Sequence, residues 1–335
     1  MKILIIKLSA IGDVLRTTTL LHGLKRKWPG SEITWITLPE AKDLLKENGF
    51  VDDVLEFNRK TSRDLETHAF DLLICLDKER NSTFLATRLK AKKKIGFGRD
   101  SKGKLSIFNK ESRYAYELGI SDELKFKINK KTYPEIIYEM CGLDYRKDKY
   151  ILNLTDKEIA WAESRLKGIG IKKGDFIVGL NTGAGTRFAN KIWSFDKHKA
   201  LIQGLLEKQD TKVLLLGGKR EAGLNKRLKD VFDSRVYSAG CDNTLREFAS
   251  IVKYCNAIIS GDTLAMHIGI ALDRYVIAVF GPTCSQEIEL YGNGEKIVSD
   301  MDCSPCYKRE CDKKHNCIAT INLKLTNLTL SNLST

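Results

Sequence analysis

The segment Ala257–Leu272, which reads AIISGDTLAMHIGIAL, constrains the fold more than any other part of the chain. Its first four residues are apolar or small and include two isoleucines, which favours a buried strand. A Gly-Asp-Thr turn at 261–263 then ends the run, and apolar residues at helical spacing follow it. Because a helix that starts in a tight turn has free backbone N–H groups, this place suits a phosphate group. An ordinary capped helix, with Asp262 or Thr263 as the cap, fits the same residues.

Apolar runs followed by helical patterns recur in both halves of the chain, which at 335 residues exceeds one typical domain. We therefore expect two Rossmann-like, doubly wound α/β domains that face each other across a cleft. The expected domains span residues 1–155 and 172–335, with a linker at about 156–171. Strands are predicted at 3–8, 32–37, 53–57, 70–76 and 94–98, and then at 176–180, 212–216, 235–237, 257–260 and 275–280. Residues 102–131 show little periodicity and are predicted to form a long loop.

The net charge of +13 favours an anionic partner. Between Arg88 and Arg113 there are ten basic and two acidic residues, but only two aromatic ones, which argues against nucleic acid. A solvated basic face fits this segment as well as an anion-binding surface does. The candidate contacts to an anionic ligand are Arg88, Lys92, Lys93, Lys94 and Arg99.

The chain has no run of about 18 apolar residues that would span a membrane. Its start, MKILIIKLSAIGDV, is typical of a first buried strand rather than of a signal peptide. We therefore expect a soluble, cytoplasmic protein.

Four of the nine cysteines lie close together in the sequence. In a cytoplasmic chain such clustering favours a structural metal over disulfides, and free thiols in a surface loop are the alternative. The cluster consists of Cys303, Cys306, Cys311 and Cys317.

A carboxylate follows the first predicted strand. Asp13 comes directly after Gly12, at the strand end where open α/β sheets bind their ligands. The surrounding residues do not form a G-x-G-x-x-G fingerprint, which weakens a dinucleotide interpretation. Asp13 is either a helix cap or a catalytic carboxylate.

The second half offers several phosphate- and sugar-binding groups at strand ends. The loop Asn181–Thr186 supplies backbone and hydroxyl donors, and Lys191 supplies a point charge for a phosphate. Glu221 follows a Gly-Gly turn, where an acid often binds ribose hydroxyls. Together with the turn at Asp262 these groups indicate a nucleotide-sugar site. A P-loop and an H-E-x-x-H motif are both missing from the sequence, and we expect no metal in catalysis.

Taken together, these motifs resemble the ADP-heptose:lipopolysaccharide heptosyltransferase family (glycosyltransferase family 9), whose fold is of the GT-B type. The order and spacing agree from residue 1 to about 317. The matching pieces are Ser9–Asp13, Gly183–Gly185 with Lys191 and Trp193, Gly261–Thr263 with His267, Phe280–Thr283 and Cys303–Cys306.

The resemblance implies a role for each matching residue. Asp13 would be the general base, and Lys191 would stabilise the leaving diphosphate. Leu264 stands where the family usually has a glycine. The implied donor contacts are Thr186 and Lys191 to phosphate, Glu221 to ribose, Asp262 to the transferred sugar, the backbone N–H groups of Thr263 and Leu264 to the pyrophosphate, and His267 on the same helix.

The predicted function is that of an inverting, metal-independent glycosyltransferase without a cofactor. It would move a heptose from a nucleotide-diphosphate donor, ADP-heptose, to the inner core of lipopolysaccharide at the inner face of the cell membrane. Two alternatives remain at this point. One is a transferase of the same fold with another nucleotide sugar and glycan acceptor, and the other is a non-catalytic nucleotide-sugar-binding module.

Overall fold

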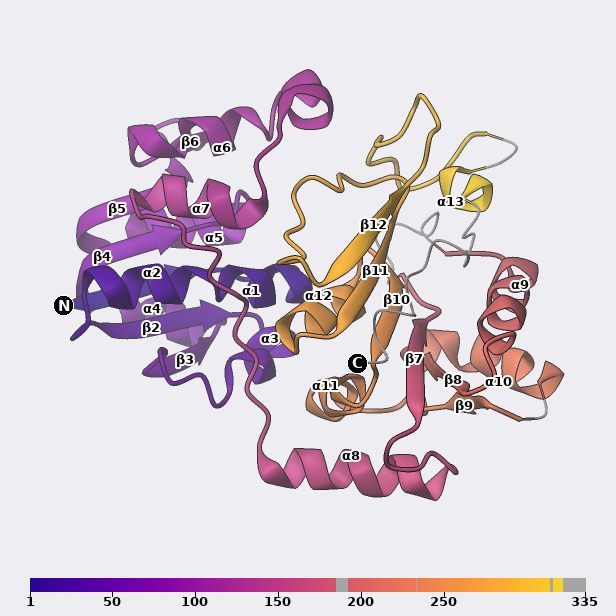
Figure 1. Cartoon of the computed structure of the whole chain (residues 1–335). Helices are drawn as coiled ribbons and strands as arrows, with labels where there is room; N and C mark the ends of the chain where they lie inside the picture. Colours follow the sequence, from indigo (N-terminus) through magenta and orange to yellow (C-terminus); the bar gives the residue numbers. More distant parts are fainter. Residues whose placement is uncertain (185–191, 233, 314–315, 322–335) are drawn as a thin grey trace. The chain divides into compact units, whose positions relative to one another are not determined.

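The computed structural model describes residues 1–184, 192–232, 234–313 and 316–321, and the chain forms two compact units (Figure 1). Unit 1 comprises Met1–Asn153 together with the short segment Gln286–Glu289. Unit 2 comprises Leu154–Ser285 and the chain from Leu290 onward. Within the described residues each unit has one mostly parallel six-stranded sheet with helices, which confirms the predicted α/β class.

The sheet of unit 1 has the order β3-β2-β1-β4-β5-β6, and its pairs are parallel except for β5 with β6. The chain starts at the centre and winds outward in both directions, as in doubly wound folds. The strands are β1 (Lys2–Ile6), β2 (Glu32–Thr37), β3 (Asp53–Glu56), β4 (Ala69–Cys75), β5 (Lys90–Arg99) and β6 (Leu105–Ile107). The helices are α1 (Ile11–Thr17), α2 (Leu20–Lys27), α3 (Pro39–Lys42), α4 (Arg59–Glu66), α5 (Arg80–Arg88), α6 (Arg113–Glu117) and α7 (Tyr133–Cys141).

Both faces of the unit 1 sheet are buried. Successive side chains of a strand point to opposite faces. Ile3 and Ile5 of β1 therefore join the core cluster that includes α2 and α7. Leu4 and Ile6 join the cluster that includes α4 and α5. Because all four side chains are fully buried, β1 is apolar without interruption, which made it recognisable in the sequence.

The sheet of unit 2 has the order β12-β11-β10-β7-β8-β9 and is parallel throughout. Its strands are β7 (Phe176–Asn181), β8 (Thr211–Leu216), β9 (Val236–Ser238), β10 (Ala257–Gly261), β11 (Tyr275–Phe280) and β12 (Gly294–Val298). Its helices are α8 (Asp156–Gly168), α9 (Phe195–Leu206), α10 (Ala222–Val231), α11 (Leu245–Lys253), α12 (Leu264–Ala271) and α13 (Cys317–Thr320).

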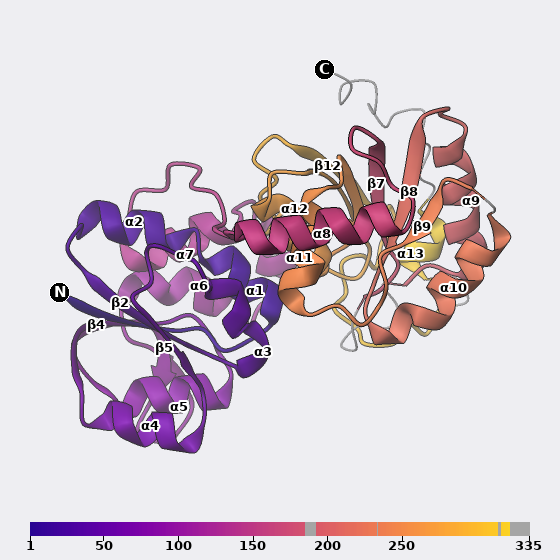
Figure 2. The same cartoon turned by 90° about the horizontal axis from the view of Figure 1, so that it is seen from below.

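The stretch expected to be a linker, at about 156–171, is mostly helix α8 and belongs to unit 2. Figure 2 shows α8 alongside α11. The contact is fixed by Arg246 of α11, which donates to both carboxylate oxygens of Glu158 at 2.7 and 2.6 Å. These hydrogen bonds lower the pKa of Glu158 to about 2.

Residues 102–131 are also more ordered than the sequence predicted. They contain β6 and α6, which are too short to produce a recognisable period. Among the described residues of both units, no helix combines the length and the apolar character needed to cross a bilayer.

Candidate active site

The carboxylate of Asp13 lies in the first turn of α1, just past the carboxyl end of β1. One of its oxygens accepts from Arg16 at 2.9 Å, and the other lies 3.9 Å from the Nζ of Lys7. Its side chain remains 34% exposed. Asp13 is thus a partly accessible carboxylate held between two cations.

Lys7 forms a buried ion pair beneath this turn. Its Nζ donates to Asp77 and, at 2.6 Å, to the carbonyl of Ser9. Asp77 also accepts from the backbone N–H of Leu8 at 2.5 Å and from Ser82 at 3.2 Å. Burial would lower the pKa of Lys7, but Asp77, with contributions from Tyr133 and Asp13, raises it above its ordinary value. The ammonium therefore stays charged, and it ties the end of β1 to the end of β4.

Arg16 is held by stacking as well as by charge. Its guanidinium carbon lies 3.8 Å from the centroid of the Tyr133 ring. Burial would lower the pKa of Arg16, but Asp13 holds it above its ordinary value. The hydroxyl of Tyr133 shares a 2.8 Å hydrogen bond with Thr17, and its backbone N–H donates to the carbonyl of Glu287 at 2.8 Å. The segment Gln286–Glu289 therefore helps to build this side of the site.

The predicted basic contacts separate into two groups. Lys92, Lys93 and Lys94 lie in the first half of β5, level with the middle of β4, whereas Asp13 follows the carboxyl end of the parallel β1. Lys92 pairs with Asp71 at 2.7 Å, and the Nζ of Lys94 donates to two carbonyls of α5 at 2.9 Å. The structure therefore does not bring these lysines to Asp13.

The two basic residues that flank these lysines have other surroundings. Arg88, at the end of α5, pairs with Glu66. Arg99 is the last residue of β5, at the same end of the sheet as Asp13, and its Nε donates to Thr83 at 2.7 Å.

In unit 2 the turn before α12 is built as the sequence predicted, except for the cap. The hydroxyl of Thr263 shares a 2.9 Å hydrogen bond with Ser260 and accepts from Asn181 at 3.3 Å. Within the described part of the chain its side chain makes no capping bond to α12, so Thr263 does not satisfy the first N–H groups of this helix. Asp262 lies 3.9 Å from Nε2 of His267, one turn into the helix.

Glu221 approaches the loop after β7 closely. Its carboxylate accepts from the backbone N–H of Gly218 at 2.9 Å. A Cβ on Gly183 would lie 2.5 Å from the Glu221 carboxyl carbon, so any larger residue there would force the Glu221 side chain to move. The structure thus brings Glu221, the Gly183 loop and the turn at Asp262 to the carboxyl ends of neighbouring strands β8, β7 and β10. The predicted phosphate contacts Thr186 and Lys191 lie outside the described residues.

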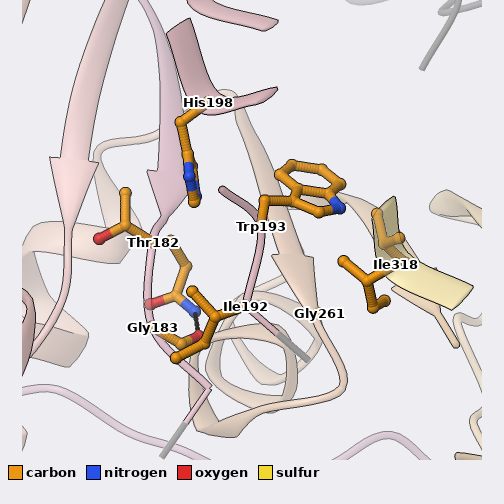
Figure 3. Close-up of a pocket in the computed structure, with 9 residues that line it drawn as sticks. Thr182, Gly183, Ile192, Trp193, His198, Gly261 and Ile318 are labelled. Atoms are coloured by element: carbon orange, nitrogen blue, oxygen red, sulfur yellow. Dashed lines mark hydrogen bonds between the residues drawn. The ribbon is translucent and has the colours of Figure 1, made fainter. Parts of the chain in front are cut away.

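A small pocket lies beside the ends of β7 and β10 (Figure 3). On one side of the pocket the rings of Trp193 and His198 pack edge to face, with 5.6 Å between their centroids. Trp193 was expected near the site from the resemblance, but no sequence pattern had indicated that His198 and Ile318 line the same space. The lining residues are Asn181, Thr182, Gly183, Ile192, Trp193, His198, Gly261, Val279 and Ile318.

The four clustered cysteines do not form a recognisable metal centre. Cys317 is buried at the start of α13, and burial raises the pKa of its thiol to about 11, whereas Cys303 is exposed. In the part of the chain that is described, no three His, Cys, Asp or Glu side chains are placed to hold a metal ion. The expected structural metal is therefore not supported. Sequence reasoning also passed over an Asp-x-Asp spacing, Asp300-Met301-Asp302, whose two carboxylates are exposed after β12.

Solved structures share this fold over most or nearly all of the chain. A glycosyl transferase family 9 structure from Veillonella parvula has a TM-score of 0.76 at 17% identity, covering 99% of this chain and 96% of its own. The E. coli ADP-heptose LPS heptosyltransferase II has a TM-score of 0.65 at 18% identity and covers 89% and 90%. The chain therefore has the GT-B fold of these glycosyltransferases.

The family follows from the sequence. Residues 58–316 match the family model described as glycosyltransferase family 9 (heptosyltransferase), and the chain belongs to this family. It is 23% identical over 350 residues to lipopolysaccharide heptosyltransferase 1 of Campylobacter coli, covering 96% of this chain and 95% of that one. It is 25% identical over 316 residues to lipooligosaccharide heptosyltransferase 2 of Haemophilus influenzae, covering 85% of each. The protein is a glycosyltransferase.

Proposed function

We propose that this enzyme transfers a heptose from ADP-heptose to the inner core of lipopolysaccharide, with inversion at the anomeric carbon and without a catalytic metal. The observation that carries the proposal is the pair of polar sites at strand ends, Asp13 in unit 1 and the Glu221–Asp262 group in unit 2. The names of its relatives support heptose and lipopolysaccharide as substrates. The E. coli heptosyltransferase WaaC, of the same fold at TM-score 0.62 and 22% identity, was solved with ADP, which supports an adenine nucleotide.

Unit 2 would bind the donor. The N–H groups of Thr263 and Leu264, left uncapped by the Thr263 side chain, suit a diphosphate because the start of a helix carries partial positive charge. Glu221 would accept hydrogen bonds from the ribose, and Asp262, with His267 behind it, from the transferred sugar. Thr186 and Lys191 would complete the phosphate contacts. We expect these donors to stabilise the charge that grows on the departing diphosphate.

Unit 1 would activate the acceptor. Asp13 takes the proton of the acceptor hydroxyl while that oxygen attacks the anomeric carbon on the face opposite the diphosphate. The new C–O bond forms as the bond to the diphosphate breaks, so the anomeric centre inverts. Arg16 and Lys7, at 2.9 and 3.9 Å, hold the carboxylate in place.

The acceptor is anionic, which agrees with the basic character of the chain. Arg99 ends β5 and Asp13 follows β1, so both lie at the same end of the unit 1 sheet. We therefore expect the acceptor to bind at that end. Contacts from Arg88, Lys92, Lys93 and Lys94 remain a prediction. Because its acceptor is lipid-linked, the enzyme would act in the cytoplasm at the inner face of the membrane.

The variant Asp13→Asn tests the base assignment. It should bind ADP as the wild type does but lower kcat by about 10²–10⁴-fold, the usual worth of general-base catalysis. Glu32→Gln, an exposed carboxylate at the opposite end of the same sheet, is the matched control and should leave both quantities unchanged. Near-normal transfer by Asp13→Asn would remove Asp13 from the mechanism. Transfer in EDTA tests the role of metal, including one bound at Asp300 and Asp302.

A second candidate function is sugar transfer by an enzyme of the same fold from a different nucleotide-sugar donor. Leu264, at the start of α12, puts a large side chain where the family usually has glycine. This residue favours a different sugar. Thermal shifts with ADP-heptose and other nucleotide sugars at equal concentration decide, because the donor that binds most tightly should raise the melting temperature most.

A further inference from the structure

The chain between α6 and α7 carries the two most exposed large apolar side chains of the described residues. Ile120 is 66% exposed and Ile128 is 58% exposed, whereas Met1, Val231 and Val298 reach 41 to 47%. Figure 1 shows this part of unit 1 as a short helical turn, Leu124–Ile128, that projects beyond α6. Apolar surface presented in this way is stabilised when a partner covers it.

The other side of this segment is firmly held. Leu124 packs on the core of unit 1, and Asn129, only 2% exposed, accepts from the Tyr114 hydroxyl at 2.6 Å. The carbonyl of Lys125 accepts from the Gln286 side chain at 2.9 Å. The two isoleucines are therefore presented by an anchored segment. Binding of a partner to this segment would cost little conformational entropy, because the segment is already held in place.

The charge beside the isoleucines favours one kind of partner. Residues 124–131, LKFKINKK, contain four lysines and no acid, and the exposed Asp122 and Glu123 before them leave the segment 120–131 with a net charge of +2. Lys131 pairs with Glu139 at 2.5 Å and Lys125 lies 4.0 Å from Glu287, whereas Lys127 and Lys130 are exposed. Exposed lysines next to apolar side chains suit an anionic lipid surface. The lysines attract the anionic headgroups, and the apolar side chains insert at the boundary between headgroups and acyl chains. Isoleucines offer no stacking surface to nucleic-acid bases.

We propose that Ile120, Lys127, Ile128 and Lys130 form a membrane-contact patch that binds bilayers rich in anionic lipid. The patch would hold unit 1 at the surface where a lipid-linked acceptor is found, and in this respect the inference rests on the proposed function. Binding to lipid itself requires no sugar transfer, so the two can fail separately.

Sedimentation of the full chain with vesicles tests the patch. The wild type should bind vesicles of phosphatidylcholine with phosphatidylglycerol and should bind pure phosphatidylcholine far more weakly. Ile120→Ser/Ile128→Ser should lower the binding about tenfold or more, because both apolar contacts are lost. Lys127→Gln/Lys130→Gln should lower it by about fivefold per lysine. Val231→Ser/Val298→Ser, which changes exposed apolar residues of unit 2, is the matched control and should bind as the wild type does.

Two outcomes would overturn the patch. One is equal binding by the wild type and the double serine variant. The other is a wild-type dimer that the serine variant turns into a monomer while neither binds vesicles, which would make this face a contact between copies. If heptose transfer is absent but vesicle binding follows the prediction, the proposed function fails and the patch stands. If transfer is present, the serine variant should retain it on an acceptor without acyl chains and lose it on the same acceptor in vesicles.

Discussion

Replacing Lys7 by methionine should destabilise unit 1 severely. Lys7 and Asp77 are 4% and 2% exposed, and the carboxylate accepts from Lys7, from the Leu8 N–H and from Ser82. Methionine fills much the same space but brings no charge. The carboxylate of Asp77 would then be buried with two neutral donors and no cation.

The cost can be estimated from this geometry. Removing one partner of a buried ion pair typically costs about 3–5 kcal/mol, because the remaining charge is uncompensated. For a unit of this size that corresponds to a melting temperature lower by roughly 6 to 20 °C. The double variant Lys7→Met/Asp77→Asn should recover more than half of the loss, because the amide oxygen can still accept from Leu8 and no buried charge remains.

Scanning calorimetry of the wild type and both variants at pH 8 measures these differences. A single variant that melts within 2 °C of the wild type at pH 8 would refute the reasoning, since about 1 kcal/mol or less would then depend on the pair. A double variant no more stable than the single one would show that the lost packing of Lys7, not the charge of Asp77, sets the cost.

Two further predictions concern unit 2. Arg246→Met should cost about 2 kcal/mol at neutral pH. The pKa of Glu158 is lowered to about 2 by Arg246, so this stability is present above the ordinary pKa and is lost as the pH falls from about 5 to 2. Urea unfolding across this range should therefore show a steeper acid loss in the wild type than in the variant, and parallel curves would contradict the pairing. Gly183→Ala should push Glu221 out of position, because the new Cβ would lie 2.5 Å from its carboxyl carbon. Calorimetric titration with ADP should show about tenfold weaker binding, comparable to losing one hydrogen bond to a charged group, and unchanged affinity would remove Glu221 from the donor site.

The fold was predictable wherever a strand is buried on both faces. The runs at β1, β4, β8 and β11 are almost wholly apolar, so their position and type were evident. β12, GEKIV, was missed because it is an edge strand with two charged residues and a half-exposed surface. β5 starts four residues earlier than predicted, because its first residues are mostly exposed lysines, which do not form the apolar run that marks a buried strand.

The candidate site was predictable only in part. Asp13, Glu221 and Asp262 could be proposed from the sequence because each directly follows a strand and a turn. The groups that hold Asp13 could not be found in the same way. Lys7 meets a carboxylate 70 positions away, and Thr17 meets Tyr133, which is 116 positions away. No local pattern records contacts of this kind.

The four residues Gln286–Glu289 have a consequence for how the protein is made. They belong to unit 1, although the chain on both sides of them belongs to unit 2. The Tyr133 amide and the Lys125 carbonyl find their partners there. A ribosome must therefore synthesise the chain as far as Glu289 before unit 1 can form these hydrogen bonds. An expression fragment that stops at residue 153 would lack the hydrogen-bond partners that Gln286 and Glu287 supply to these two groups. Truncation is therefore a poor way to study the N-terminal half alone.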